Sequence, residues 1–120
     1  MSWGYNQQSG IITHNDEYMG VGYSGYPPNV NNPKAQGIID SGPIPKGTYT
    51  ITFIGNTDTH GPFVLGLIPA KANVMFGRSG FLMHSDSIMH PGFASKGCII
   101  CLTSLRQLIW LSKDIVLIVS

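Results

Sequence analysis

The length, composition and charge of the chain indicate one small folded domain without a strongly charged surface. Its 120 residues, 42% hydrophobic and 11% charged, suit a single domain spanning residues 1–120, because one core is typical of about 100–150 residues. The net charge of +1 gives no basic surface large enough to indicate nucleic acid or an anionic membrane as the main partner. No apolar run approaches the roughly 18–20 residues of a membrane span.

The glycine, proline and cysteine content indicates the fold class and the state of the two thiols. Fifteen glycines and eight prolines are spread among short runs of Val, Ile, Thr and Tyr, which predicts a turn-rich, mainly β protein. The amino terminus lacks the basic region and apolar core of a secretory signal, so we expect either action in the cytoplasm or export by another route. Two cysteines cannot form a disulfide framework, and we expect Cys98 and Cys101 to be free thiols.

The first half of the chain is expected to form strands around a long loop. A hairpin over residues 3–14, with its turn at residues 8–10, precedes a strand over residues 17–23. Residues 26–41 are rich in Pro and Asn and predict a long loop, which is either a binding element or a solvated connector. Turn-forming residues 42–47 then lead into a strand in which Tyr49, Ile51 and Phe53 share one face.

The second half is expected to hold further strands and one helix. Strands are predicted over residues 63–68, 80–84 and 114–120. Before the last of them, Ser104 and Gln107 resemble a capping box at the start of a helix. Apolar residues at helical spacing follow, namely Leu105, Leu108, Ile109 and Leu111. His14 and His60 fall on predicted turns, where we expect exposed side chains without a catalytic role.

Residues 83–102 carry the clearest indication of chemistry, a cysteine behind a Ser-x-Gly turn, fourteen positions after a histidine. A thiol attacks as the thiolate, and its usual pKa near ~8.5 leaves little thiolate at neutral pH, so a catalytic cysteine needs a base. His84 can be that base for Cys98, and backbone N–H groups of the Gly97–Cys98 turn can hold an oxyanion. His90 is a competing base. The alternative is an incidental thiol and a hydrogen-bonded core histidine.

Several segments, in the same order along the chain, resemble the catalytic domains of L,D-transpeptidases, which act on peptidoglycan. Residues 95–99, Ser-Lys-Gly-Cys-Ile, preceded by His84-Ser85, are similar to the family's Ser-His-Gly-Cys-Ile-Arg-like signature, and residues 42–51 resemble its Thr-Pro-x-Gly-x-Phe/Tyr-x-Ile segment. The opening Ser2-Trp3 and residues 76–82 are closer still to the compact L,D-transpeptidase-like effectors of bacterial type VI secretion. The resemblance implies an L,D-transpeptidase-like β-sandwich or barrel with one helix near the C-terminus.

The same resemblance implies roles for individual residues. Cys98 would be the nucleophile and His84 the general base and later acid, with the Ser85 carbonyl orienting the imidazole and Gly97 shaping the turn. The wider family has histidine in place of Lys96 and often arginine in place of Ile100. Further substrate-binding residues would be Tyr23, Arg78, Asp86, His90, Ser95 and Lys96.

Several of these substrate-binding roles have alternatives. Arg78 is our candidate for gripping a substrate carboxylate, with a surface arginine in a glycine loop as the alternative. Asp86 could instead cap a turn, and Ser95 could hold the turn, which is the role we favour for it. The charge of Lys96 could also lower the pKa of the thiol.

The implied function is that of an antibacterial effector that attacks the cell wall. Cys98 would form a thioester with a stem tetrapeptide and release D-alanine as an L,D-carboxypeptidase, or exchange the terminal D-amino acid. We expect no cofactor and no metal, a monomer without membrane insertion, and action in the periplasm of a target cell. Expected partners are peptidoglycan stem peptides, a periplasmic immunity protein and a type VI secretion carrier.

Two other functions remain open from the sequence. A metal-dependent peptidoglycan peptidase or amidase could use His84, Asp86 and His90, with His60 as a further ligand. A non-catalytic wall-binding module could use the loop of residues 26–41 as its contact surface. The sequence does not distinguish hydrolysis from exchange.

Overall fold

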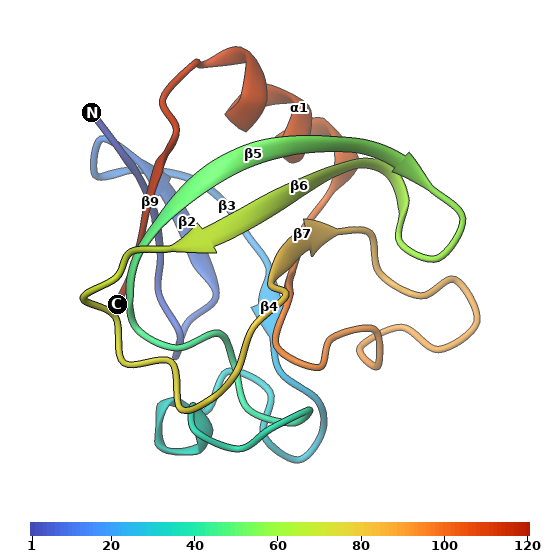
Figure 1. Cartoon of the computed structure of the whole chain (residues 1–120). Helices are drawn as coiled ribbons and strands as arrows, with labels where there is room; N and C mark the ends of the chain where they lie inside the picture. The colour runs from blue at the N-terminus through green and yellow to red at the C-terminus, as the bar shows by residue number, and fades with distance from the viewer.

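The computed structural model describes all residues 1–120 and has nine strands and one α-helix (Figure 1). The strands are β1 (Trp3–Tyr5), β2 (Ile11–His14), β3 (Glu17–Val21), β4 (Tyr23–Ser24), β5 (Gly47–Thr57), β6 (Gly61–Pro69), β7 (Leu82–His84), β8 (Ile99–Ile100) and β9 (Val116–Val119). Helix α1 spans Thr103–Leu111, and a short 3-10 helix spans Pro33–Ala35 within the loop predicted for residues 26–41. The expected mainly β fold with one late helix is confirmed. No helix is long and apolar enough to cross a membrane.

All nine strands belong to one mixed sheet in the order β3-β2-β1-β9-β5-β6-β7-β8-β4. The edge strands β3 and β4 are separated along the chain by Gly22 alone, so the sheet has to curl until its two edges lie side by side. The close approach requires glycine there, because a Cβ atom on Gly22 would lie 2.2 Å from the carbonyl oxygen of Ile100 in β8. The strand predicted over residues 17–23 is therefore two strands that form the opposite edges of the sheet.

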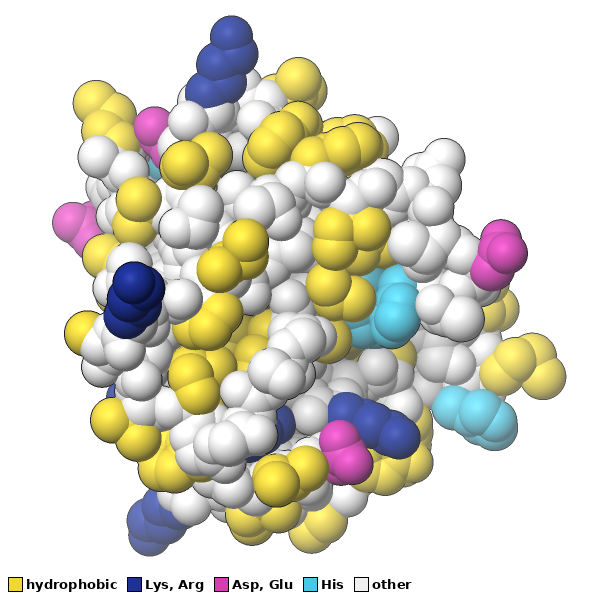
Figure 2. Space-filling view, viewed as in Figure 1, with side chains coloured by type: hydrophobic (Ala, Val, Ile, Leu, Met, Phe, Trp, Pro, Cys, Tyr) yellow, Lys and Arg dark blue, Asp and Glu magenta, His cyan; other side chains and the backbone are white.

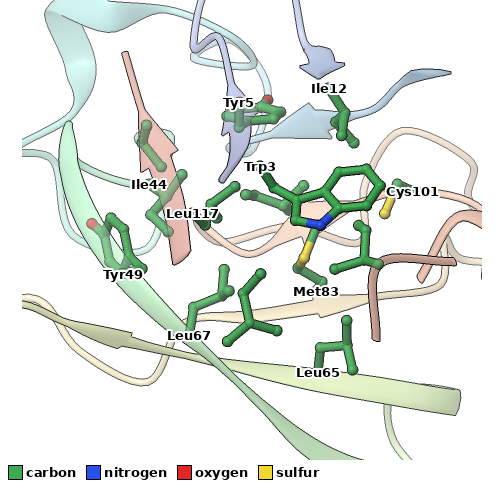
Figure 3. Close-up of a cluster of buried hydrophobic side chains, with 14 of the residues drawn as sticks. Trp3, Tyr5, Ile12, Ile44, Tyr49, Leu65, Leu67, Met83, Cys101 and Leu117 are labelled. Atoms are coloured by element: carbon green, nitrogen blue, oxygen red, sulfur yellow. The ribbon is translucent and has the colours of Figure 1, made fainter. Parts of the chain in front are cut away.

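The curled sheet and α1 enclose one cluster of sixteen buried residues. Figure 3 shows the Trp3 indole among side chains from β2, β6, β7 and β9, with the Met83 side chain directed toward it. Trp3 is 1% exposed, and its Nε1–H donates to the Ser112 hydroxyl at 3.0 Å. The core therefore fixes β7 from behind, which leaves the other face of that strand available for chemistry.

Strand β5 departs from the simple alternation expected from its sequence. Tyr49 and Ile51 are buried, as expected, but Phe53 is 48% exposed. Register shifts between Phe53 and Gly55 and between Gly55 and Thr57 interrupt the pairing with β6. Because bulges bend a strand and redirect its side chains, the hairpin of β5 and β6 curves at this point, and its tip carries His60.

Helix α1 forms where expected but begins differently. It starts at Thr103 after Leu102, which makes no side-chain capping bond, so the predicted capping box at Ser104 is wrong. Leu105 and Ile109 face the core, whereas Leu108 and Leu111 are exposed. The charged residue Arg106 is also buried, between Leu105 and Ile109 in the sequence of the helix.

Three further expectations concern short segments. Strands β1 and β2 form the predicted antiparallel hairpin, and both cysteines are free. The expectation for His14 is wrong, because its ring lies within β2, stacks on Trp3 at 4.2 Å between centroids and contacts Asp114 at 2.6 Å from Nε2 to Oδ2.

Candidate active site

His84 is the last residue of β7, and Cys98 directly precedes the neighbouring parallel strand β8. In the pairing of β7 with β8, Met83 is opposite Ile99 and His84 is opposite Ile100. Side chains alternate along a strand, and Met83 and Ile99 are fully buried in the core, so Cys98 and His84 share the opposite face. A strand spacing of about 4.8 Å and a rise of about 3.3 Å per residue place their Cα atoms about 8 Å apart. Side chains at this separation can extend toward each other.

The turn before Cys98 is held by hydrogen bonds from buried hydroxyl groups. Ser95 is fully buried, and its hydroxyl donates to the Cys98 carbonyl at 2.5 Å while accepting from the N–H of Gly97 at 3.1 Å. The Ser24 hydroxyl donates to the Gly97 carbonyl at 2.7 Å. Gly97 has a φ of 135°, and a Cβ atom there would lie 2.6 Å from Nη2 of Arg78. The turn therefore needs glycine, and the expected structural role of Ser95 accounts for its contacts.

The hydrogen bonds of the turn determine which backbone N–H groups can hold an oxyanion. The Gly97 N–H is engaged by Ser95, so the expectation that it is available to a substrate is not supported. The backbone N–H groups of Leu82 and Cys98 face the sulfur instead.

Arg78 lies behind the Cys98 turn as a structural anchor. Its Nη1 donates to the carbonyls of Gln36 and Pro43, and its Nη2 donates to those of Gly42 and Lys96, at 2.6–3.1 Å. These four bonds use all four hydrogens of the two terminal nitrogens, and Arg78 is only 7% exposed. The geometry therefore contradicts the expected bidentate grip on a substrate carboxylate.

Burial governs the electrostatics of the thiol. It raises the pKa of Cys98, while the N–H of Leu82 and the positive charge of Arg78 act in the opposite direction. The cation that favours the thiolate is thus Arg78, not Lys96 as expected. Because the net shift is upward, Cys98 is a neutral thiol at neutral pH and needs a base when it attacks.

The His84 imidazole is oriented by the adjacent backbone. Its Nδ1 lies 2.8 Å from the Ser85 carbonyl, and since a carbonyl only accepts, Nδ1 carries the proton and Nε2 is left as the basic nitrogen. Burial lowers the pKa of His84, the Ser85 carbonyl raises it, and the neighbouring His60 and Arg106 lower it further. His84 therefore stays neutral at neutral pH, which is the state a general base requires.

His60, at the tip of the β5–β6 hairpin, lies against His84. The two ring centroids are 4.6 Å apart at an interplanar angle of 64°, and Nδ1 of His60 lies 3.0 Å from the Thr59 hydroxyl. Sequence reasoning placed His60 on an exposed turn without a role. His60 does lie on the predicted turn, but its ring is half-buried against His84, because the bulges in β5 bend the hairpin.

Arg106 is the most important residue near the site that sequence reasoning missed. It is fully buried and donates to the Ser85 hydroxyl at 2.7 Å, to the Pro62 carbonyl at 2.8 Å and to the Phe63 carbonyl at 3.0 Å. It also donates to the Cys101 carbonyl and to the Thr103 hydroxyl. One side chain therefore ties the start of β6, the end of β7 and the helix together behind His84. An arginine in the middle of an otherwise apolar helix face was the signal available in the sequence.

The loop after β7 contains the remaining predicted residues. Oδ1 of Asp86 accepts from the Tyr23 hydroxyl at 2.6 Å and from the N–H of Ser87 at 2.8 Å, so Asp86 takes the turn-capping alternative. Burial and the bond to Asp86 raise the pKa of Tyr23 to about 12. The Tyr23 hydroxyl also accepts from the Ala94 N–H at 3.1 Å. Both residues therefore hold the loop closed.

His90 is exposed on this loop and lines a separate hollow with Tyr26, Ser87 and Phe93. The register of β7 brings His84, not His90, to the face that carries Cys98. The structure contains no group of three His, Cys, Asp or Glu side chains placed to hold a metal ion. The ligand set of the metal-dependent alternative is therefore not assembled.

Two cavities lie beside Cys98 and His84, one at each residue. One, of about 340 Å³, is lined by Cys98 together with Asp40, Arg78 and Lys96. The other, of about 600 Å³, is lined by His60, His84, Asp86 and Met89 among others. Figure 2 shows histidine side chains at the surface of this face, with basic and acidic side chains visible below them. A peptide can therefore approach the pair from two directions.

Comparison with protein families identifies one match. The family model of the Tlde1 domain matches residues 19–114, a range that runs from within β3 to the segment between α1 and β9 and includes His84 and Cys98. No curated protein and no solved structure matches the chain.

Proposed function

Because the chain belongs to the Tlde1 domain family, whose members are type VI secretion effectors that act on peptidoglycan, we propose that it is a cysteine-dependent L,D-carboxypeptidase and L,D-transpeptidase. Its substrate is the tetrapeptide stem, and the bond cleaved joins the L-centre of diaminopimelate to the terminal D-alanine. Removing or replacing that D-alanine spoils the stem as a donor for cross-linking, which is toxic to a growing cell.

The reaction has two half-reactions at one sulfur. Nε2 of His84 accepts the thiol proton as Sγ of Cys98 attacks the carbonyl carbon, and the oxyanion is held by the Cys98 N–H. The tetrahedral intermediate collapses when His84 returns that proton to the amine of D-alanine, which leaves a thioester. Water then hydrolyses the thioester, or the amine of a free D-amino acid attacks it, with His84 again accepting the proton.

The observation that carries this proposal is the hydrogen bond between Nδ1 of His84 and the Ser85 carbonyl. It selects the tautomer whose free Nε2 can serve as a base, on a residue that shares one face of the sheet with a partly exposed cysteine. An incidental core histidine would instead have both ring nitrogens bonded within the protein. Typical general base catalysis contributes about 10²–10⁴-fold.

The test is mass spectrometry of purified muropeptides incubated with the wild type, Cys98→Ala and Cys101→Ala. Cys101 is a matched control, because it is a second free cysteine whose burial raises the pKa of its thiol to about 11. We expect the wild type and Cys101→Ala to trim tetrapeptides to tripeptides, and Cys98→Ala to leave them intact. Added free D-amino acid should give exchanged tetrapeptides with the wild type only. Trimming by Cys98→Ala would refute the mechanism.

Delivery and protection follow from the same proposal. Residues 1–120 would act as one catalytic domain in the periplasm of the target cell, after transfer by a type VI secretion carrier. A periplasmic immunity protein that covers the Cys98 cavity would protect the producing cell. Co-expression of such a protein should restore growth of cells that receive the effector in the periplasm.

A further inference from the structure

The cavity at Cys98 is lined by two exposed, opposite charges that form no ion pair with each other, and by the Arg78 guanidinium, which lies near Asp40 and is 7% exposed. Asp40 and Lys96 both line this cavity of about 340 Å³ and both are exposed. The single ion pair within 4.0 Å in the chain joins His14 and Asp114, far from the site in sequence. A carboxylate and an ammonium group therefore face the same space beside the nucleophile, each free to bind a ligand.

The backbone at both charges is anchored, so their positions are defined although their side chains are exposed. The Lys96 carbonyl accepts from Nη2 of Arg78 at 3.1 Å, and the Gly42 carbonyl, two residues after Asp40, accepts from the same nitrogen at 2.8 Å. The Gly42 N–H also closes a turn onto the Ile38 carbonyl at 2.9 Å. One buried guanidinium thus holds the segments that carry Asp40 and Lys96 at the same cavity.

The position of the base decides which part of a substrate enters this cavity. His84 has to reach the amine that leaves, and His84 lines the second cavity rather than this one. The leaving residue therefore lies on the His84 side, and the acyl part that becomes bonded to Cys98 extends into the cavity of Asp40 and Lys96.

We propose that Asp40 and Lys96 form a subsite for a zwitterionic α-amino acid group, filled by the distal amino and carboxylate groups of diaminopimelate in the stem. Asp40 binds the ammonium and Lys96 the carboxylate. This inference rests on the proposed function, and it adds selectivity for diaminopimelate stems over stems with lysine, which has the ammonium but lacks the carboxylate. A free D-amino acid has the same zwitterionic chemistry, so the test has to separate the two sources.

The experiment measures kcat and KM for D-alanine release from two tetrapeptides, one with diaminopimelate and one with L-lysine at the third position. The proteins are the wild type, Asp40→Asn, Lys96→Gln and, as a matched charge control, Lys113→Gln, which lies after α1 and away from this cavity. We expect the wild type to have a KM about 2- to 5-fold lower for the diaminopimelate peptide, the effect of one partly exposed ion pair.

The variants should separate by substrate. Lys96→Gln should raise KM about 2- to 5-fold for the diaminopimelate peptide and leave it unchanged for the lysine peptide, because only the first has a carboxylate that Lys96 can bind. Asp40→Asn should raise KM for both. Lys113→Gln should match the wild type, and kcat should change less than KM throughout.

Two results would overturn the inference. Equal KM values of the wild type for the two peptides, or an equal effect of Lys96→Gln on both, would show that no carboxylate is bound there. Variants that raise the KM for free D-amino acid in exchange, but not for the stem, would assign the subsite to the acceptor. In both cases D-alanine release would persist, whereas failure of the proposed function would abolish it for every peptide.

Discussion

Replacing Arg106 tests whether one buried side chain holds the site and the fold together. Arg106→Met keeps most of the apolar volume but removes all donors to the carbonyls of Pro62, Phe63 and Cys101. A buried acceptor left without its partner costs about 1–3 kcal/mol, so three of them cost about 3–9 kcal/mol. Relief from burying a charge offsets part of this. We expect a net loss of about 3–4 kcal/mol, a large share of the roughly 5–15 kcal/mol of a typical domain.

The assay is urea denaturation followed by tryptophan fluorescence, with Trp3 in the core as the main reporter. Arg106→Lys should lose about half as much stability, because one ammonium with three hydrogens cannot serve all five acceptors. Leu108→Met on the exposed side of α1 should change stability by less than about 0.5 kcal/mol. A loss below about 1 kcal/mol for Arg106→Met would refute the reasoning. The variant should also lose activity under conditions where it is folded, because Ser85, whose carbonyl orients His84, loses the donor that holds its hydroxyl.

Three further substitutions test the electrostatics and the turn. His60→Phe keeps an aromatic ring against His84 but removes a group that lowers the pKa of His84, so the acid limb of the kcat/KM profile should move to higher pH. An unchanged limb would contradict this effect. Gly97→Ala places a Cβ atom against Arg78 at a φ of 135° and should cost about 1–3 kcal/mol, measured by thermal unfolding. Ser95→Ala removes the hydrogen bonds to Gly25, Gly97 and Cys98 and should lower the free energy of unfolding by about 2–4 kcal/mol. It should also slow alkylation of Cys98, which mass spectrometry can follow. An unchanged alkylation rate would show that the turn does not depend on Ser95.

The pKa shifts of His84 and Cys98 predict the pH dependence of the wild type. The pKa of His84 lies below its usual value, so protonation should remove the base only in acid solution and activity should persist through neutral pH. The pKa of Cys98 lies above its usual value, so alkylation of the free enzyme should keep rising with pH beyond the usual cysteine range. A rate of alkylation that is flat from pH 6 to 9 would instead indicate a preformed thiolate.

The sequence alone determined the elements whose signal is local. Alternating apolar residues predicted β5 up to Ile51, turn residues predicted the hairpin of β1 and β2, and the spacing of apolar residues predicted α1. The Ser-x-Gly-Cys turn, with the histidine before it, was also readable, because backbone conformation and thiol chemistry depend on adjacent residue types. These features need no knowledge of distant parts of the chain.

The tertiary structure decided which distant groups meet. Arg78 was expected to bind a substrate carboxylate and Arg106 carried no prediction, because charged side chains are seldom fully buried. Each is nevertheless buried and bonded to carbonyls that other segments supply. His60 reaches His84 only because two bulges bend the hairpin. Strand register and bulges set these contacts, and both depend on pairing between segments far apart in the sequence, which no local pattern encodes.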